Sequence, residues 1–365
     1  MTLEVRSLPV PDSSGTVESV WTDLLGRSGE TSPFLTQEWF EACCVALRDR
    51  EPELLVVEEQ GAPIALIPLQ RRTGSHRGLP VRYLSLVDCP DSPVADFIVT
   101  GHAEPVVRAL VDHLLTRSDW DVLELARLAA GSPTLKALEA ELSGRLAWRR
   151  AGTDLSPYLA IDGSWKTFYG ATSQRFKKTA RNTHNRLARL GKVVVEEHRA
   201  LDPDERLFEE VVDLTNRSWK ADRGVAIATM PRMREFFAEL SRRATRRGWL
   251  SLWLLRLDDE PIAMEYQLRA DGIVHALRAD YDLRFAASSP GSVLNFEIAR
   301  ALFERGDVHE YRMGPGLNDY KMRWATACHE TVRIQAYRNG LYPRLLHYAE
   351  TTLVPAARRL REWFT

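Results

Sequence analysis

The sequence predicts a mixed α/β fold built from two copies of one strand-and-helix unit. Strand-like runs alternate with amphipathic helices, but several strands also follow one another directly through tight turns. Hairpins give antiparallel neighbours and strand–helix–strand runs give parallel ones, so we expect a mixed sheet rather than a purely parallel one. The length of 365 residues allows two domains.

A pattern that occurs twice indicates the duplication. Residues 54–65 read LLVV, a polar turn and PIA, and residues 252–263 read LWLL, a polar turn and PIA. Later in each half a helix leads into a similar strand, DVLEL at 121–125 and DVHEY at 307–311. Matches this short also arise by chance, but their order and similar separation predict two copies of one unit.

In the first half, apolar periodicity and turn residues define the elements. We expect helices at 16–27 and 37–47, strands at 54–57 and 64–69 joined by a Gln60-Gly61 hairpin turn, a basic loop at 71–78, strands at 83–86 and 97–99, a helix at 105–115, a strand at 122–125 and a helix at 133–142.

The second half follows the same criteria. We expect a strand at 193–197, helices at 204–218 and 231–247, strands at 250–257, 262–268 and 273–281 with turns at Asp258-Asp259 and Asp271-Gly272, a helix from Pro290, a strand at 308–313, a short turn through Tyr320-Lys321, a strand at 332–337 and a long amphipathic helix at 341–364.

The start of the helix at Pro290 is a candidate anion site. Ser289 suits the capping position, Pro290 suits the first helical position, and Gly291 adds no side chain. The unpaired N–H groups of a first helical turn and its partial positive charge attract phosphates or oxyanions. A capped helix after a loop is the alternative.

A cationic segment connects the two halves. Residues 173–190 contain no Asp or Glu but hold seven potential cations, Arg175, Lys177, Lys178, Arg181, His184, Arg186 and Arg189. This is either a solvated helix with an apolar seam or a basic face for the phosphates of a nucleotide, coenzyme or tRNA.

Composition excludes several classes of protein. The hydrophobic share of 44%, the charged share of 27% and the net charge of −1 are ordinary for a globular protein and give no overall attraction to DNA. The four cysteines and the histidines never cluster at ligand spacing, so we expect no metal. No run is apolar enough for membrane insertion, and residues 1–10 do not resemble a secretion signal, so we expect a cytoplasmic location.

The second half resembles the GNAT N-acyltransferases. The match comprises a strand that ends in Tyr281-Asp282, a helix opened by Ser289-Pro290-Gly291, Arg305-Gly306, and then Gly314 and Gly316 before Tyr320-Lys321. Two such units joined through a basic segment resemble the FemAB-like and CelD-like branch of that superfamily. The resemblance implies an N-terminal GNAT-like domain at 1–162, a basic linker helix at 163–191, a catalytic domain at 192–340 and a helix at 341–365 that returns to the first domain.

The resemblance implies transfer of an acyl group from acyl-CoA to an amino or hydroxyl group of a saccharide or amino-acid-like acceptor, in polysaccharide or cell-envelope precursor modification. The candidate residues for binding the donor are Arg284, Ser288, Ser289, Gly291, Ser292 and Asn295. Residues 284–289 read RFAASS, however, where these enzymes usually carry glycines, and alanine does not adopt positive φ at low cost. An aminoacyl-tRNA donor, for which Arg175 and Lys178 could bind the RNA, and a non-catalytic binding module are the alternatives.

Acyl transfer also needs a base, an acid and a stabiliser of negative charge. The candidate bases are Glu265, His275, Asp280 and Asp282, the last two of which share a strand face, where one carboxylate should raise the pKa of the other. In Fem-like relatives the lysine at the position of Lys321 lies at the reaction centre. Further candidates are Tyr281, Tyr311 and Tyr320 as proton donors or stacking platforms, and Arg278 as a partner for an anionic acceptor. Each of these side chains has a structural alternative in the core or on the surface.

Overall fold

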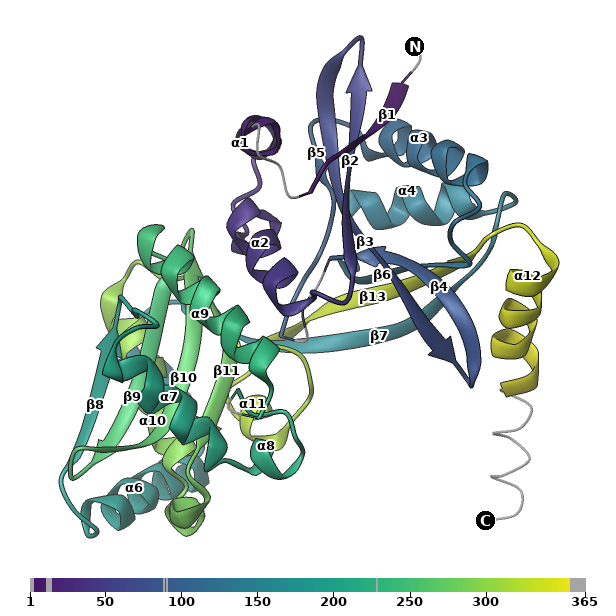
Figure 1. The fold of residues 1–365 in the computed structure, drawn as a ribbon. Coiled ribbons are helices and arrows are strands. Elements are labelled where there is room, and N and C mark those ends of the chain that lie inside the picture. The colour runs from purple at the N-terminus through teal and green to yellow at the C-terminus, as the bar shows by residue number, and fades with distance from the viewer. Residues whose placement is uncertain (1–2, 11–14, 88, 90, 228, 355–365) are drawn as a thin grey trace.

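The computed structural model describes residues 3–10, 15–87, 89, 91–227 and 229–354. Both halves of the chain contribute strands to one large mixed sheet (Figure 1). The strands are β1 (Leu3–Leu8), β2 (Glu51–Glu59), β3 (Ala62–His76), β4 (Leu79–Leu86), β5 (Ile98–Val99), β6 (Val122–Ala129), β7 (Ala147–Ala160), β8 (Val193–His198), β9 (Leu250–Leu257), β10 (Glu260–Ala270), β11 (Ile273–Tyr281), β12 (Glu310–Arg312) and β13 (Ala327–Tyr337). They lie in the order β1-β2-β3-β4-β6-β13-β7-β12-β11-β10-β9-β8, and β5 pairs with β3. The predicted mixed α/β class is confirmed.

The two halves exchange strands at the centre of the sheet. Strand β7 leaves the first half and pairs with β12 of the second, whereas β13, near the end of the chain, returns to pair with β6 of the first. The two exchanged strands also pair with each other, antiparallel, from Ala327↔Tyr158 to Tyr337↔Ala147. The halves therefore share continuous backbone hydrogen bonding, and the domain boundaries at 162, 191 and 340 stay predictions.

Helices cover both faces of the sheet. They are α1 (Thr16–Ser28), α2 (Gln37–Ala46), α3 (Ala103–Thr116), α4 (Pro133–Leu142), α5 (Trp165–Ala171), α6 (Gln174–Ala188), α7 (Arg206–Asn216), α8 (Trp219–Asp222), α9 (Pro231–Arg246), α10 (Pro290–Arg305), α11 (Asp319–Met322) and α12 (Leu341–Tyr348). One apolar core lies under α1, α2, α7 and α9, a second under α3 and α4, and a third under α10. None of the described helices is long and apolar enough to cross a membrane.

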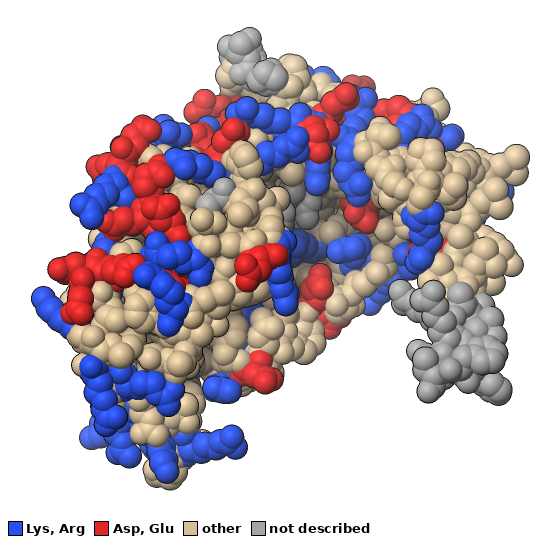
Figure 2. All heavy atoms as spheres, turned by 60° about the horizontal axis from the view of Figure 1, so that its bottom comes forward, with Lys and Arg blue, Asp and Glu red and all other residues tan. Residues whose placement is uncertain are grey.

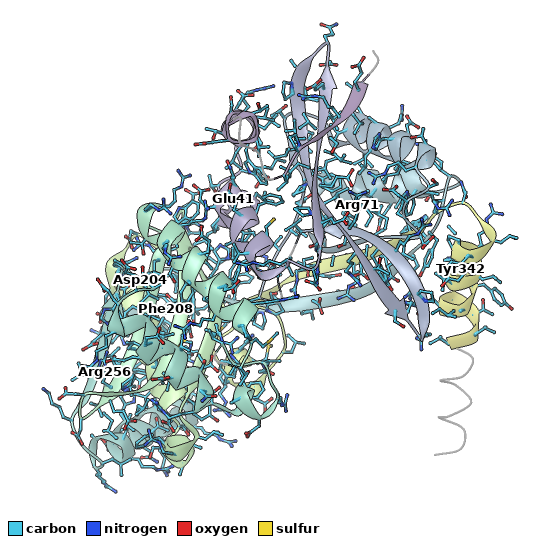
Figure 3. The ribbon with its side chains drawn as sticks, viewed as in Figure 1. Glu41, Arg71, Asp204, Phe208, Arg256 and Tyr342 are labelled. Atoms are coloured by element: carbon cyan, nitrogen blue, oxygen red, sulfur yellow. The ribbon has the colours of Figure 1, made fainter. Side chains whose placement is uncertain are left out.

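Helices α2 and α9 hold the two halves together. The rings of Trp39 and Phe236 meet edge to face, with their centroids 5.5 Å apart. At the rim of this contact, the carboxylate of Glu41 pairs with Arg243 (Glu41 is labelled in Figure 3). Aromatic pairs of this geometry stabilise a core beyond the burial of their area, so the first half is fixed relative to the second.

The predicted hairpin turns are confirmed. Both central residues adopt left-handed backbone angles, with φ of 51° and 80° at Gln60-Gly61, 48° and 68° at Asp258-Asp259, and 48° and 70° at Asp271-Gly272. This is the pattern of type I′ turns, whose twist matches that of the flanking strands.

Other local predictions were wrong. The basic loop expected at 71–78 lies mostly in β3, where the guanidinium of Arg72 stacks 3.8 Å over the ring of Tyr83. Strands β1 and β7 were not predicted, because both are partly exposed and lack a clear apolar alternation. The last helix ends at Tyr348 and continues as a π-helical turn, Ala349–Leu353; the rest of the predicted helix, 355–364, lies outside the described residues.

Candidate active site

A cavity opens where β11 and β12 separate. The two strands pair in parallel from Ile273↔Glu310 to His275↔Arg312, and beyond that point β12 ends while β11 continues to Tyr281. The gap forms a cavity of about 580 Å³, lined by β10, β11, the start of α10, and the segment from Met313 to Lys321. A separation of this kind exposes backbone edge and side chains of β11 to a ligand.

The start of α10 closes one end of the cavity, and Gly291, Ser292 and Asn295 line it. The predicted capping by Ser289 was wrong, because this residue adopts a left-handed φ of 53° and its side chain makes no capping hydrogen bond. Its carbonyl instead accepts from the amides of Ser292 and Val293, at 3.0 and 3.3 Å. Since Pro290 has no N–H, the amide of Gly291 remains as the first-turn donor without a helical acceptor, so the anion site has fewer donors than expected.

Arg284 does not face the cavity. Its guanidinium folds back onto Asp282, with Nη2 2.6 Å from Oδ2, and also contacts Glu260. Burial raises the pKa of Asp282, but hydrogen bonds from Arg284 and Arg217 outweigh it and lower this pKa, opposite to a rise caused by Asp280. Ser288, in the same 3-10 turn (Leu283–Ser288), is buried. These residues shape the turn before α10.

Asp280 belongs to a fixed ionic wall. Its carboxylate accepts from Ser218 Oγ at 2.8 Å, Arg278 Nε at 2.9 Å and Lys220 Nζ at 3.3 Å. Arg278 also donates to the carbonyl of Val225 at 2.7 Å. With its acceptor sites occupied by three donors, Asp280 is better suited to hold this wall in place than to accept a proton.

Glu265, Tyr311 and Asn295 line the floor of the cavity, and Gln267 bonds to them from the core. The Tyr311 hydroxyl donates to Glu265 Oε1 at 2.5 Å, and Gln267 Nε2 donates to the same oxygen at 2.7 Å. Asn295 Nδ2 donates to the Tyr311 hydroxyl at 3.1 Å. Burial raises the pKa of Glu265, although the hydrogen bond from Tyr311 opposes this effect. A carboxylate whose pKa is raised is a stronger proton acceptor, so Glu265 is suited to the role of a base.

Lys321 completes this group. Its ammonium donates to the carbonyls of Gly314 and Pro315, at 3.1 and 2.7 Å. Burial lowers the pKa of Lys321 to about 8, against the attraction of the nearby Glu265. The ring of Tyr320 lies 6.0 Å from the Lys321 ammonium, and both Tyr320 and Tyr281 line the cavity.

His275 lies apart from the cavity. Its ring packs edge-on against Phe34 of the first half, with centroids 4.8 Å apart. Burial lowers the pKa of His275 to about 3, and Nδ1 has no hydrogen-bond partner among the described residues. The neutral imidazole is therefore a packed core group.

The basic helix α6 borders a second hollow. Lys and Arg side chains gather there, at the lower left of Figure 2. Arg175 lines a groove of about 770 Å³ with Phe176 and Trp324, whereas Lys178 is exposed on the helix. The groove shares Ser292, Asn295 and Tyr320 with the main cavity, so it extends that cavity along α6.

Sequence reasoning missed the residues that reach the cavity from elsewhere. Asp91 and Arg127 come from the first half, and Lys220 comes from α8. Asp91 Oδ2 is buried and accepts no hydrogen bond from any described residue; Arg278 Nη1 lies 3.8 Å away. Burial raises the pKa of Asp91 and lowers that of Lys220. No local pattern signals these approaches, because they depend on how the halves pack.

Comparisons with known proteins agree with this geometry. Residues 174–322 match the family model described as an acetyltransferase (GNAT) domain. No curated protein sequence matches the chain significantly. Of the solved structures, FemX aligns over 94% of this chain and 100% of its own, with a TM-score of 0.61 and 11% identity.

Two further structures have the same architecture. A tandem GNAT protein from the clavulanic acid biosynthesis pathway aligns over 93% of this chain and 100% of its own, with a TM-score of 0.54 and 13% identity. L-PGS from Bacillus licheniformis aligns over 92% and 95%, with a TM-score of 0.54 and 12% identity. The chain thus has the tandem-GNAT, Fem-like fold, and residues 174–322 form a GNAT acetyltransferase-like domain, which supports an acyl-transfer function.

Proposed function

We propose that this protein transfers an acyl group from acyl-CoA to an amino or hydroxyl group of a saccharide or amino-acid-like acceptor, in the modification of a polysaccharide or cell-envelope precursor. The observation that carries the proposal is one continuous cavity. It joins the start of α10 to the cluster of Glu265, Tyr311, Asn295 and Lys321. A carrier bound at one end would present its acyl carbon to these side chains.

The donor end fits a pyrophosphate group. The amide of Gly291 and the partial positive charge of α10 attract its negative charge. A side chain on Gly291 would extend toward the ring of Tyr281, 3.4 Å from the added Cβ, so the glycine keeps this end of the cavity open. Beyond His275 the edge of β11 has no partner among the described strands, and it can bind the amide groups of the carrier arm.

The reaction needs no covalent enzyme intermediate. The acceptor nitrogen or oxygen attacks the thioester carbonyl, a bond to carbon forms, and the carbon–sulfur bond breaks. Glu265 accepts the proton that the nucleophile loses, and the Lys321 ammonium stabilises negative charge on the carbonyl oxygen. Tyr320, which lines the cavity beside Lys321, supplies a proton to the leaving thiolate.

A second candidate function uses aminoacyl-tRNA as the donor. The exposed cations of α6 and the groove beside Arg175 favour it, because phosphate contacts dominate RNA binding. Binding through many phosphates weakens steeply as salt rises, whereas binding of a single coenzyme weakens much less.

A thermal-shift screen tests both functions. Acetyl-CoA and longer acyl-CoA are compared with charged and uncharged tRNA, against the wild type, Gly291→Val and the double variant Lys178→Ser/Arg181→Ser. A ligand at about 100 times its Kd adds about 2.7 kcal/mol to the free energy of unfolding. We expect acyl-CoA to stabilise the wild type and the α6 variant but not Gly291→Val. Stabilisation by charged tRNA that the α6 variant loses would select the second function, and no stabilisation by either ligand would leave a binding module with another ligand.

A further inference from the structure

The C-terminal helix exposes its large apolar side chains. Leu341 is 87% exposed, Leu345 65%, Tyr348 53% and Leu353 54%. The first three are spaced four and three residues apart, so they share one helical face. Tyr342 (labelled in Figure 3) is 37% exposed, but its hydroxyl donates to the carbonyl of Pro80 in the first half. We call Leu341, Leu345, Tyr348 and Leu353 the apolar ridge. Exposed apolar patches on folded proteins mark interaction sites.

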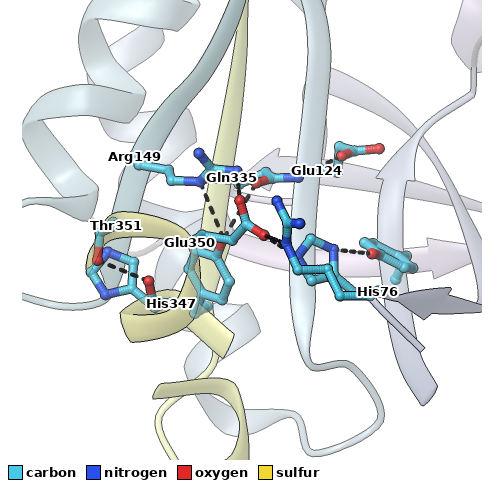
Figure 4. A network of polar contacts seen from close by, with 10 residues as sticks. His76, Glu124, Arg149, Gln335, His347, Glu350 and Thr351 are labelled. Carbon is cyan, nitrogen blue, oxygen red and sulfur yellow. Dashed lines mark hydrogen bonds and ion pairs between the residues drawn. The ribbon is translucent and has the colours of Figure 1, made fainter. Parts of the chain in front are cut away.

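The opposite face of the same segment packs against the first half, where Pro343 and Leu346 are buried and a polar network follows them. Glu350 is buried, and its carboxylate accepts from His76 at 2.7 Å, Arg77 at 2.6 Å and Arg149 at 3.1 Å (Figure 4). Gln335 connects this group to Glu124, because its amide nitrogen donates to Glu124 at 2.7 Å. The network anchors the segment to the first half with its carboxylate inward, so the apolar ridge faces outward.

The charges beside the apolar ridge have one sign. Arg344 is exposed on α12, and Glu350, the one acidic residue of 341–354, is turned inward. An apolar face of leucines and a tyrosine beside an arginine is typical of helices that lie in the interface of an anionic bilayer.

From these observations we propose that the apolar ridge binds the protein peripherally to an anionic lipid surface. The leucines and Tyr348 enter the headgroup region, and Arg344 contacts lipid phosphates. The helix lies at the edge of the molecule, at the opposite end from β8 and α6 (Figure 1), where a planar surface can reach it. The proposal does not depend on the acyltransferase reaction.

A second copy of the chain is a poorer occupant. A stable protein interface buries about 800 Å² per partner, more than one exposed helix face of two turns provides. An anionic bilayer supplies negative charge opposite Arg344, and its apolar region is larger than the apolar ridge.

Vesicle co-sedimentation of the full chain tests the proposal. Vesicles of mixed phosphatidylglycerol and phosphatidylcholine are compared with pure phosphatidylcholine, at low and high salt. We expect binding to the anionic vesicles that salt weakens, and a partition coefficient at least about tenfold lower for Leu341→Ser/Leu345→Ser. Leu190→Ser changes a leucine that is 53% exposed and lies just after α6; it is the control and should bind like the wild type.

Three outcomes would overturn the proposal. One is that the wild type does not bind anionic vesicles at low salt. Another is that Lys178→Ser/Arg181→Ser removes binding while Leu341→Ser/Leu345→Ser does not, which would assign binding to α6. The third is a dimer that Leu341→Ser/Leu345→Ser dissociates, measured by analytical ultracentrifugation. Since both leucines are exposed, the thermal unfolding midpoint should not change, and this confirms that any loss of binding does not come from unfolding.

Discussion

The two halves of the sheet each contain a parallel strand pair, and the two pairs end differently. In the first half, β4 and β6 pair from Tyr83↔Val122 to Ser85↔Glu124. The returning chain then fills the gap beyond them: the amide of Ala95 donates to the carbonyl of Arg127 at 3.1 Å, and Phe97 is buried beside it. In the second half, β11 and β12 separate after His275 and leave the cavity. One unit thus closes where the other opens.

The side chains at matching positions of the repeat differ in the same way. Ile67 and Leu125 occupy the repeat positions of Glu265 and Tyr311, and both are fully buried in apolar core. Glu265 and Tyr311 are also buried, but they bond to each other beside the cavity. The two units therefore differ in the polarity of two matching positions and in whether a loop fills the gap beside the parallel strands. The loop that closes the first gap also carries Asp91 into the second.

The largest effect expected is that of Glu265→Gln. Glutamine keeps the size of the side chain and can still accept the hydrogen bond from Tyr311, but it cannot take up a proton. If Glu265 is the base, kcat should fall by about 100- to 10,000-fold with little change in the free energy of unfolding. Steady-state kinetics with acetyl-CoA and denaturant unfolding measure the two quantities.

The matched position in the first half should respond in the opposite way. Ile67→Ala removes core packing and should lower the free energy of unfolding by about 2–5 kcal/mol, while kcat per folded molecule stays unchanged. A wild-type kcat in Glu265→Gln, or a large loss of kcat in Ile67→Ala without a loss of stability, would contradict the assignment of the active site to the second half and of a structural role to the first.

Lys321 should give the next largest effect, as a function of pH. Its pKa of about 8 means that the ammonium form dominates below that pH and disappears above it. If the charge stabilises the oxyanion, kcat should fall by about tenfold per pH unit above this pKa. Lys321→Arg keeps its charge at every accessible pH, so this decline should be absent from its kcat profile. A decline that persists in Lys321→Arg would assign the titration to another group.

Much of the second half could be predicted from local sequence. The helix at Pro290, the type I′ turns at Asp258-Asp259 and Asp271-Gly272, and the strands around Glu265 follow from turn chemistry and periodicity, which act over a few residues. Glu265 was recognisable because a carboxylate interrupts an otherwise apolar strand. Lys321 was recognisable because it follows a glycine-rich turn after a strand. These signals are local, as are the structures that they predict.

The remainder depends on pairing between distant segments. Strands β7 (147–160) and β13 (327–337) pair with each other across the two halves. The sequence of neither strand indicates which other strand it will pair with. The sequence predicted Arg284 as a ligand of the donor, but its guanidinium pairs with Asp282 and Glu260. The approach of Asp91 to Arg278 follows from the packing of one half against the other, which local propensity does not encode.

Asp91→Asn tests whether the first half takes part in binding. Asp91 Oδ2 is buried and accepts no hydrogen bond from the described residues, so an acceptor substrate that donates one to it would satisfy the group. We expect the KM for the acceptor to rise about tenfold and the affinity for acyl-CoA to stay constant. Asp96→Asn, in the same loop but bonded to Ser132 at 2.6 Å, is the control and should leave the acceptor KM unchanged. Equal effects from both variants would indicate a loop that is structural only.

The smallest effect on activity should come from His275→Leu, in the same strand as the ionic wall but outside the cavity. The pKa of His275 in the folded protein is about 3, below the ordinary value of 6.5, so between these values the unfolded chain binds more protons. The free energy of unfolding should therefore fall as pH decreases through this window, by about 2 kcal/mol between about pH 7 and about pH 5. His275→Leu should lack this part of the pH dependence and keep the wild-type kcat, which urea unfolding at the two pH values and an activity assay would measure. A large loss of kcat in this variant would instead place the imidazole in the reaction and remove the distinction between cavity and core side chains of β11.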